Sequence, residues 1–313
     1  MFLHELPDIK ELFLVVSDEK AIHPSIVEKD YWVMHTLWGL QQQGFEFELK
    51  GGTSLSKGFN IIDRFSEDID IQIHPTTSQE VKSGKNHNKK SHIESRKNFF
   101  DTLSNVLAIP GLHFQRDHEF DDLSKMRSAG IRGTYQSHFP SLAALKEGIL
   151  LEVGFDKTTP YDSRNISSWA YEKAIASGVQ ITNNQAANVK CYLPEYTLIE
   201  KLQTISTKYR VNKQKNIESP VNFIRHYYDV YQLLHTERVK KFLGTDDYYT
   251  YKQEKFGLLN ETDLTKNPAF QLSEPGELGK FSSLYQKKAE IYFGATPEFQ
   301  TMIEYIKNCA NML

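Results

Sequence analysis

Cysteine is scarce in this 313-residue sequence, which contains only Cys191 and Cys309. They lie far apart in the chain, so they form neither a disulfide framework nor a zinc-ligand spacing. Long apolar runs are also lacking, because no stretch approaches the ~18 consecutive apolar residues that cross a bilayer. The first residues, MFLHELPDIKELFLVV, carry interspersed charges, unlike a signal peptide. These absences predict a cytoplasmic protein with no membrane association.

A large excess of charge of either sign is absent as well. The formal net charge is −3 and apolar residues make up 39% of the sequence, which excludes a globally basic protein and is sufficient for a packed core. Basic residues do concentrate in two places, residues 82–97 and 208–215. Each is either a solvated, charge-rich segment or a surface that follows a nucleic-acid backbone.

Apolar periodicity predicts mixed strands and helices in the first two-thirds of the chain and helices in the last third. We expect helices near 24–43, 92–108 and 194–209, a further helix from Ser219-Pro220, and strands near 45–49, 68–73, 112–118, 130–136, 148–155 and 187–192. Residues 156–185 are expected to be irregular with at most one short helix, and residues 210–219 to form a linker. The order predicts an α/β (α+β) fold, with a mixed β-sheet core in residues 1–193. A helical C-terminal region, residues 194–313, is expected to close one side of a cleft.

The segment R-F-S-E-D-I-D-I-Q-I indicates chemistry most strongly. In a strand, Asp68, Asp70 and Gln72 share one face, and the isoleucines between them share the other. Neighbouring carboxylates repel each other unless a cation lies between them, which favours Mg²⁺ or Mn²⁺ together with substrate phosphates. A solvated acidic edge strand is the alternative, and a D-x-D motif taken alone favours it.

A glycine pair precedes this strand in the segment Gly51-Gly52-Thr53-Ser54. The pair lies between a predicted strand and a predicted helix, with Thr53 expected as the helix N-cap. Backbone N–H groups at a helix start favour an anion, and glycine lets the backbone approach a triphosphate to which Thr53 or Ser54 donates. Because the acid pair follows one helix later, we expect a phosphate cradle and a metal clamp to converge.

Four segments, in order, resemble the AbiEii/AbiGii toxin family of nucleotidyltransferases. They are V-E-K-D-Y-W-V, then K-G-G-T-S-L-S-K followed by R-F-S-E-D-I-D-I, then T-L-I-E-K-L, and finally R-H-Y-Y-D-V-Y-Q-L-L. The resemblance covers residues 25–235 and implies a nucleotidyltransferase-like core that transfers a nucleoside monophosphate from an NTP to an acceptor hydroxyl. It further implies a toxin of a toxin–antitoxin or phage-defence pair, with RNA, a tRNA 3′ end or a protein as acceptor and a cognate antitoxin as partner.

The resemblance assigns two residues in the later segments. Lys201 lies off the apolar stripe of its predicted helix and would add a positive charge near the triphosphate. Asp229 would be an essential acid that either positions Lys201 or activates the acceptor hydroxyl. The alternative for Asp229 is an ion pair with Arg225 one turn earlier on the same helix.

Three further positions are candidates with open alternatives. Ser66 matches a family serine near the triphosphate, or accepts a hydrogen bond from a turn amide. Arg64 pairs with Asp63 or with phosphate. Glu152 is the candidate third metal ligand, and Asp156, on the same face of its predicted strand, is the rival.

A function of another class stays open beside the enzyme. A catalytically idle member of the family would bind a nucleotide or a nucleic acid as an interaction module. Incorporation of labelled NTP distinguishes the two, because an idle protein binds NTP and modifies no acceptor.

Overall fold

The computed structural model describes residues 1–75, 80–140, 142–143, 145–156, 158–219, 221–257, 260–287, 289–294 and 296–313. The chain divides into two compact units. We call residues 1–59 with 65–192 the sheet unit, and residues 60–64 with 193–313 the helical unit. The division after residue 192 lies one residue from the expected boundary, but residues 60–64 belong with the later part of the chain.

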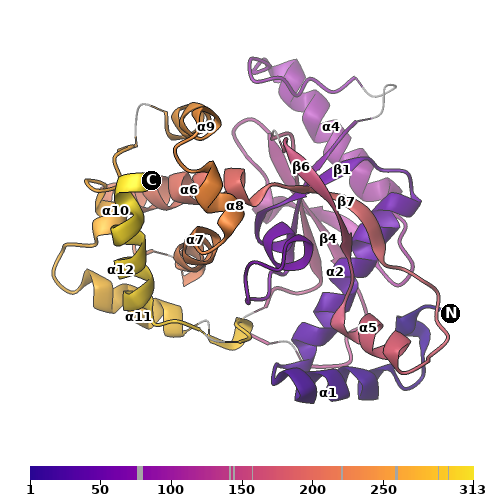
Figure 1. Ribbon diagram of the computed structural model, residues 1–313. Helices are drawn as coiled ribbons and strands as arrows, with labels where there is room; N and C mark the ends of the chain where they lie inside the picture. Colours follow the sequence, from indigo (N-terminus) through magenta and orange to yellow (C-terminus); the bar gives the residue numbers. More distant parts are fainter. Residues whose placement is uncertain are drawn as a thin grey trace. The chain divides into compact units, whose positions relative to one another are not determined.

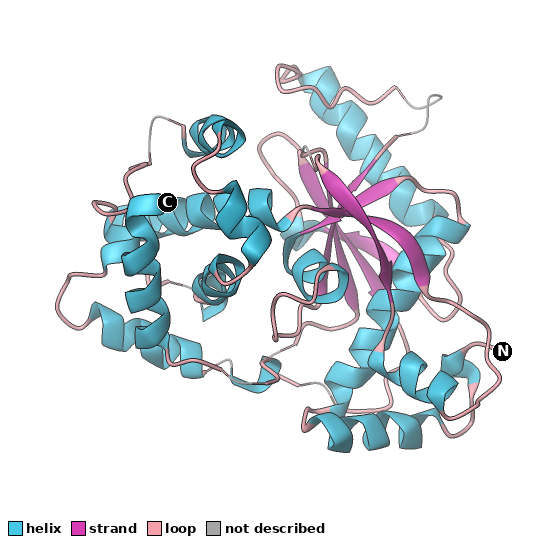
Figure 2. Cartoon of the chain, in the orientation of Figure 1, coloured by secondary structure: helices cyan, strands magenta, loops and turns pink. Residues whose placement is uncertain are grey.

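The strands of the sheet unit form a mixed sheet, shown in magenta in Figure 2. Its strands lie in the order β3-β4-β5-β2-β1-β7-β6. They are β1 (Phe47–Lys50), β2 (Asp68–Ile73), β3 (His113–Asp117), β4 (Ser128–Thr134), β5 (Ile149–Gly154), β6 (Tyr161–Ile166) and β7 (Ala186–Tyr192). β2 is central, with β5 parallel on one side and β1 antiparallel on the other. This order places two separate acid-bearing segments of the sequence, β2 and β5, next to each other.

The helices of the sheet unit are α1 (Ile9–Lys20), α2 (Pro24–Gln42), α3 (Gly51–Thr53), α4 (Lys90–Val106) and α5 (Trp169–Ala176). α2 begins with Pro24 in its first turn, and the His23 side chain accepts a hydrogen bond from the Ser25 N–H. Almost every position from 25 to 40 in α2 is buried, because α1, α5 and the strands β5 and β7 all pack against it. α4 packs against β3. Figure 1 shows α1, α2 and α5 side by side.

The helical unit contains α6 (Pro194–Lys215), α7 (Arg225–Leu234), α8 (Glu237–Phe242), α9 (Asp246–Phe256), α10 (Pro268–Gln271), α11 (Glu277–Gln286) and α12 (Phe299–Cys309). Its core lies around α7, which packs against both α6 and α12, and apolar residues at helical spacing fill it. The segment 60–64 joins this unit through its backbone: Asp63 C=O accepts from the Phe293 N–H at 2.9 Å, and Asp63 N–H donates to the Tyr228 hydroxyl at 3.1 Å.

The expected strands and most expected helices are confirmed, including β2 at its predicted bounds. The prediction for 156–185 is wrong in one respect: α5 is the one short helix that it allowed, but β6 also lies there and pairs with β7. The sequence of β6, YDSRNI, alternates exposed and half-buried residues, and the four residues between Tyr161 and Ile166 are all polar. The linker prediction is also wrong, since α6 continues through polar residues to Lys215. The helix expected from Ser219-Pro220 is α7, and it begins later, at Arg225. Pro220 itself lies outside the described residues.

Candidate active site

The acid-bearing face of the sheet is formed by two neighbouring strands. Ile69, Ile71 and Ile73 are at most 1% exposed, so β2 is fixed in the core by one face and presents Asp68 and Asp70 on the other. In the parallel pairing of β2 with β5, Asp70 is in register with Glu152. We call Asp68, Asp70 and Glu152 the acidic face.

Glu152 is in register with Asp70, whereas its rival Asp156 lies beyond the end of β5. Asp156 follows the end of β5, and its side chain, 68% exposed, pairs with Lys50 at 2.8 Å. The geometry therefore favours Glu152 over Asp156 as the third acid beside the pair. Alternation along the predicted strand does not distinguish Glu152 from Asp156, because it places both side chains on the same face.

An ammonium group compensates part of the negative charge of the acidic face. Lys146 Nζ lies 2.7 Å from Asp68 Oδ2 and 3.9 Å from Glu152 Oε1. The other oxygen of Asp68, Oδ1, is buried and has no hydrogen-bond partner in the described part of the chain. A buried carboxylate oxygen without a partner is costly unless a cation or donor reaches it.

The donor set fits a divalent cation held jointly with a substrate. Within the described ranges, no group of three or more His, Cys, Asp and Glu side chains forms a ready-made metal cage. Mg²⁺ does not require such a cage, because it uses one or two carboxylates, several waters and substrate phosphates. The unpartnered Asp68 Oδ1 and the all-oxygen acidic face meet that requirement.

The glycine bend touches the acidic face directly. Gly51 directly follows β1 and has a positive φ of 72°, a conformation that glycine adopts without strain. A Cβ built at Gly51 would overlap Oδ2 of Asp70. The absence of a side chain at residue 51 therefore makes room for the Asp70 carboxylate, and the bend and the acid pair form one site.

The hydroxyls of the bend hold the fold together, and Thr53 is not a helix N-cap. The helical turn already begins at Gly51 and continues as a π-helical turn over Ser54–Gly58. Thr53 is fully buried, and its hydroxyl donates to the main-chain oxygens of Ser66 and Asp68. Ser54, also fully buried, donates to the Tyr192 oxygen at 3.3 Å. The two hydroxyls thus tie the bend to β2 and β7 instead of projecting toward a substrate.

Gly52 and Ser66 lie in the same part of the sheet unit. Gly52 is buried within the helical turn. Ser66 is 7% exposed and lies two residues before Asp68. Their assignment to the triphosphate stays a prediction.

Three consecutive charged residues of α2 brace this site, and sequence reasoning gave them no role. Glu28, Lys29 and Asp30 are at most 2% exposed. Asp30 accepts from Lys57 at 2.5 Å and thereby holds the turn that follows the glycine bend. Their presence in an otherwise apolar helix was the signal, because buried charges occur almost only when they are paired.

The other two charges of this run reach different segments. Glu28 accepts from the Ser137 hydroxyl at 2.6 Å and the His138 N–H at 2.9 Å. Lys29 donates to Glu67 at 2.7 Å, directly before Asp68. Burial raises the pKa of Glu28 and lowers the pKa of Lys29, in each case against the charged form.

A second charged cluster lies in the helical unit. Arg64 Nε and Nη2 donate to the two oxygens of Asp229 at 2.7 and 2.8 Å. Lys201 Nζ lies 2.9 Å from Asp229 Oδ2. Burial alone would raise the pKa of Asp229, but the adjacent Arg64 and Lys201 outweigh it and hold this pKa well below its ordinary range. Burial lowers the pKa of Lys201.

This cluster changes two expectations. Arg64 is 1% exposed and is engaged by Asp229, which replaces the expected pairing with Asp63 or phosphate. Asp229 is paired with Arg64 and Lys201 and not with Arg225, whose Nε is buried without a partner among the described residues. The predicted catalytic roles of Lys201 and Asp229 stay predictions, and their contact is the arrangement expected of an acid that positions a lysine.

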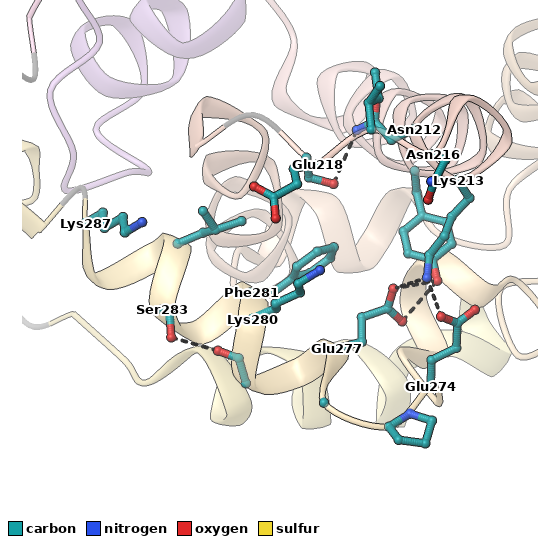
Figure 3. A pocket seen from close by; sticks show the side chains of 17 residues that line it. Asn212, Lys213, Asn216, Glu218, Glu274, Glu277, Lys280, Phe281, Ser283 and Lys287 are labelled. Carbon is teal, nitrogen blue, oxygen red and sulfur yellow. Dashed lines mark hydrogen bonds and ion pairs between the residues drawn. The ribbon is translucent and has the colours of Figure 1, made fainter.

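The basic segments are partly committed to internal contacts. Arg96 is fully buried and donates to main-chain oxygens of residues 82, 87, 125 and 126. In the helical unit, a hollow of about 830 Å³ lies beside α6 and α11 (Figure 3). There Lys213 pairs with Glu274 and Glu277, which raise its pKa. Arg96 is therefore not available to a nucleic-acid backbone, and Lys213 is engaged by two carboxylates.

These observations define a class of site. A glycine bend in contact with paired strand acids, in a mixed sheet with a third acid in register, is the arrangement of a phosphoryl- or nucleotidyl-transfer site. Residues 36–304 match the family described as "Nucleotidyl transferase AbiEii toxin, Type IV TA system". The chain belongs to this family and is a nucleotidyltransferase.

Two solved structures show distant similarity. One is an antigenic nucleotidyltransferase-like protein from Paracoccidioides brasiliensis, with 14% identity, a TM-score of 0.35, and coverage of 74% of this chain and 95% of that one. The other is terminal uridylyl transferase 4 from Trypanosoma brucei with bound UPU, with 9% identity, a TM-score of 0.28, and coverage of 97% and 98%. No curated protein matches the chain. In the described part of the chain, no helix has both the length and the apolar character needed to span a membrane.

Proposed function

We propose that the chain is a metal-dependent nucleotidyltransferase that moves a nucleoside monophosphate from an NTP to an acceptor hydroxyl. The observation that carries this proposal is the contact between the glycine bend and the acidic face, with Asp68 Oδ1 buried and lacking a partner. A site for a triphosphate tail and a site for its cation thereby coincide. The family description supports transfer chemistry and a role as a toxin.

The residues of the sheet unit would act mainly by positioning. Asp68, Asp70 and Glu152 would hold Mg²⁺ or Mn²⁺, and Gly51 would let the substrate approach the backbone. When bound, the cation lowers the pKa of the attacking hydroxyl and offsets charge on the leaving group. The acceptor hydroxyl loses its proton to solvent as its oxygen forms a bond to the α-phosphorus, and the bond from that phosphorus to the bridging oxygen breaks. Pyrophosphate leaves with that electron pair.

The resemblance to the family gives the helical unit a part in this chemistry. We propose that Lys201 contributes positive charge to the NTP and that Asp229 acts by orienting it. Support comes from the 2.9 Å contact between the two side chains and from the exposure of Lys201, which is 12% against 0% for Asp229. Asp229 would accordingly act through Lys201 and not touch the substrate.

The acceptor and the biological context are the finer part of the proposal. An RNA or tRNA 3′ end, or a protein side chain, supplies the hydroxyl, and a cognate antitoxin restrains the enzyme. The Type IV toxin–antitoxin wording of the family description supports the pairing with an antitoxin. Fold and donor site do not fix the acceptor, so it must be found by experiment.

The test is incorporation of each α-labelled NTP into total RNA, purified tRNA and protein, with Mg²⁺ or Mn²⁺ present. We expect label in one acceptor class, and we expect Asp70→Asn to reduce it by at least about 10³-fold, because a metal charge is lost with little change in volume. Tight NTP binding without label in any acceptor would indicate the idle interaction module. Unchanged labelling in Asp70→Asn would exclude the metal assignment.

A further inference from the structure

A lysine outside the strands lies among the acids of the sheet unit. Lys146 precedes β5, and its ammonium contacts Asp68 Oδ2 at 2.7 Å with Glu152 Oε1 at 3.9 Å. The centroid of the Phe120 ring is 4.6 Å from the same ammonium. The Lys146 side chain is 24% exposed, so water and ions reach its ammonium group. The ammonium lies where a cation bound to the same oxygens would have to lie.

The main chain of Lys146 is held by a buried ion pair. Glu67 Oε2 accepts from the Lys146 N–H at 2.7 Å and from Lys29 Nζ at 2.7 Å. Lys29 Nζ also donates to the Lys146 carbonyl oxygen at 2.5 Å. Lys29 is 2% exposed and Glu67 12%. A surface lysine in a chance contact has no such support, whereas here the backbone is fixed and only the side chain can move.

The two oxygens of Asp68 differ in a way that suits an exchange of cations. Oδ2 is neutralised by Lys146, and Oδ1 is buried without a partner among the described residues. A cation that coordinates Oδ1 therefore has no hydrogen bond to break there, whereas at Oδ2 it must first displace Lys146. The released ammonium keeps its contact with the Phe120 ring, which is a favourable place for a positive charge.

We propose that Lys146 is a built-in counter-ion of the acidic face. Its ammonium holds Asp68 in place without a divalent cation and competes with that cation for Asp68 and Glu152. This inference rests on the proposed function, because it takes both acids as cation ligands. It adds a residue that sets metal affinity, and it assigns Lys29 and Glu67 as positioning residues that hold Lys146 in register with the acids.

The test compares Mn²⁺ binding, followed by electron paramagnetic resonance, in the wild type, Lys146→Met and Lys146→Arg. Methionine keeps an unbranched side chain, one atom shorter than that of lysine, and carries no charge. We expect the Kd for Mn²⁺ to fall by about tenfold in Lys146→Met, because one charge-assisted hydrogen bond no longer has to break. Lys146→Arg keeps a cation in place and should restore the wild-type Kd. Without Mn²⁺, Lys146→Met should melt at a lower temperature than the wild type.

A control separates direct competition from a general change in charge. Lys173→Met removes one positive charge from an exposed pair with Glu19 in the same unit and should leave the Kd unchanged. Raising KCl from about 0.1 to about 0.5 M screens long-range effects, so the tighter binding of Lys146→Met should persist. Equal Kd values for the wild type and Lys146→Met would overturn the inference and leave the proposed function intact. No Mn²⁺ binding by either protein would overturn both.

Discussion

The two charged clusters of this chain each place an aspartate beside a lysine, but they differ in how completely the aspartate is paired. In the helical unit, both oxygens of Asp229 are bonded, and the partners Arg64 and Lys201 are themselves largely buried. In the sheet unit, Asp68 has one oxygen on a partly exposed lysine and one without a partner in the described residues. A saturated buried ion cluster resists change, whereas an incompletely paired one accepts a ligand. The comparison indicates that Asp229 stabilises the fold, whereas Asp68 is placed to take up a cation.

The largest effect on stability is expected at the saturated cluster. Asp229→Asn removes the negative charge and leaves Arg64 and Lys201 buried without it, which should cost about 3–5 kcal/mol of unfolding free energy. Urea unfolding measures this loss. Glu237→Gln is the matched control, because Glu237 pairs with Lys240 on the surface of the same unit, and its unfolding midpoint should not move. An Asp229→Asn midpoint equal to that of the control would show that the cluster stabilises nothing.

The pH dependence of this effect has a definite sign. The pKa of Asp229 is depressed in the folded state by Arg64 and Lys201, so its stabilisation is fully present above the unfolded pKa of about 3.9. It is lost only as the pH falls from there toward the depressed value. The difference in unfolding free energy between wild type and Asp229→Asn should therefore stay constant from about pH 8 to about pH 5 and shrink in more acid solution. A difference that shrinks between pH 8 and pH 5 would contradict the assigned pKa direction.

An intermediate effect is expected at the glycine bend. Gly51→Ala introduces a methyl group that overlaps the Asp70 carboxylate, at a cost of about 1–3 kcal/mol, and it should abolish transfer by displacing Asp70. Gly44→Ala is matched, because Gly44 has a similar φ of 75° but no neighbour within 4 Å of the added Cβ. The control should show only the penalty for a left-handed alanine, about 1 kcal/mol, with normal transfer. Equal activities of the two variants would separate the bend from the acid pair.

The smallest stability effect is expected at Lys201. Lys201→Met removes one hydrogen bond to Asp229 but also relieves the cost of burying an ammonium, and Arg64 still holds the carboxylate. We expect a loss of about 1 kcal/mol together with a large loss of NTP transfer. Lys240→Met, at an exposed position of the same unit, should retain activity. A melting temperature that falls as far as in Asp229→Asn would assign Lys201 to stability alone.

The sequence revealed the parts of the site that follow local rules. The alternation D-I-D-I-Q-I predicts β2 and its acidic face because side chains alternate along a strand. Gly51 contacts Asp70 because the bend directly follows β1, and β1 pairs with β2, which carries Asp70. The two strands are close in sequence. The polar strand β6 was missed, because its stability comes from pairing with β7 and not from its own composition.

Long-range pairings were beyond such rules. Arg64 and Asp229 are 165 residues apart, and nothing in either local segment specifies the other. Lys146 and its support by Lys29 and Glu67 were missed for the same reason, since Lys29 and Lys146 are 117 residues apart. The buried run Glu28-Lys29-Asp30 gave a local signal of pairing but no information on its partners.

Mn²⁺ titration of the wild type, Asp68→Asn and Lys201→Met, followed by electron paramagnetic resonance, tests the central claim most directly. The claim is that the acidic face of the sheet unit, with the unpartnered oxygen of Asp68, holds the cation. We expect one bound Mn²⁺ in the wild type and in Lys201→Met, and a Kd at least about tenfold higher in Asp68→Asn, because a charged ligand is lost. Wild-type affinity in Asp68→Asn would contradict the account.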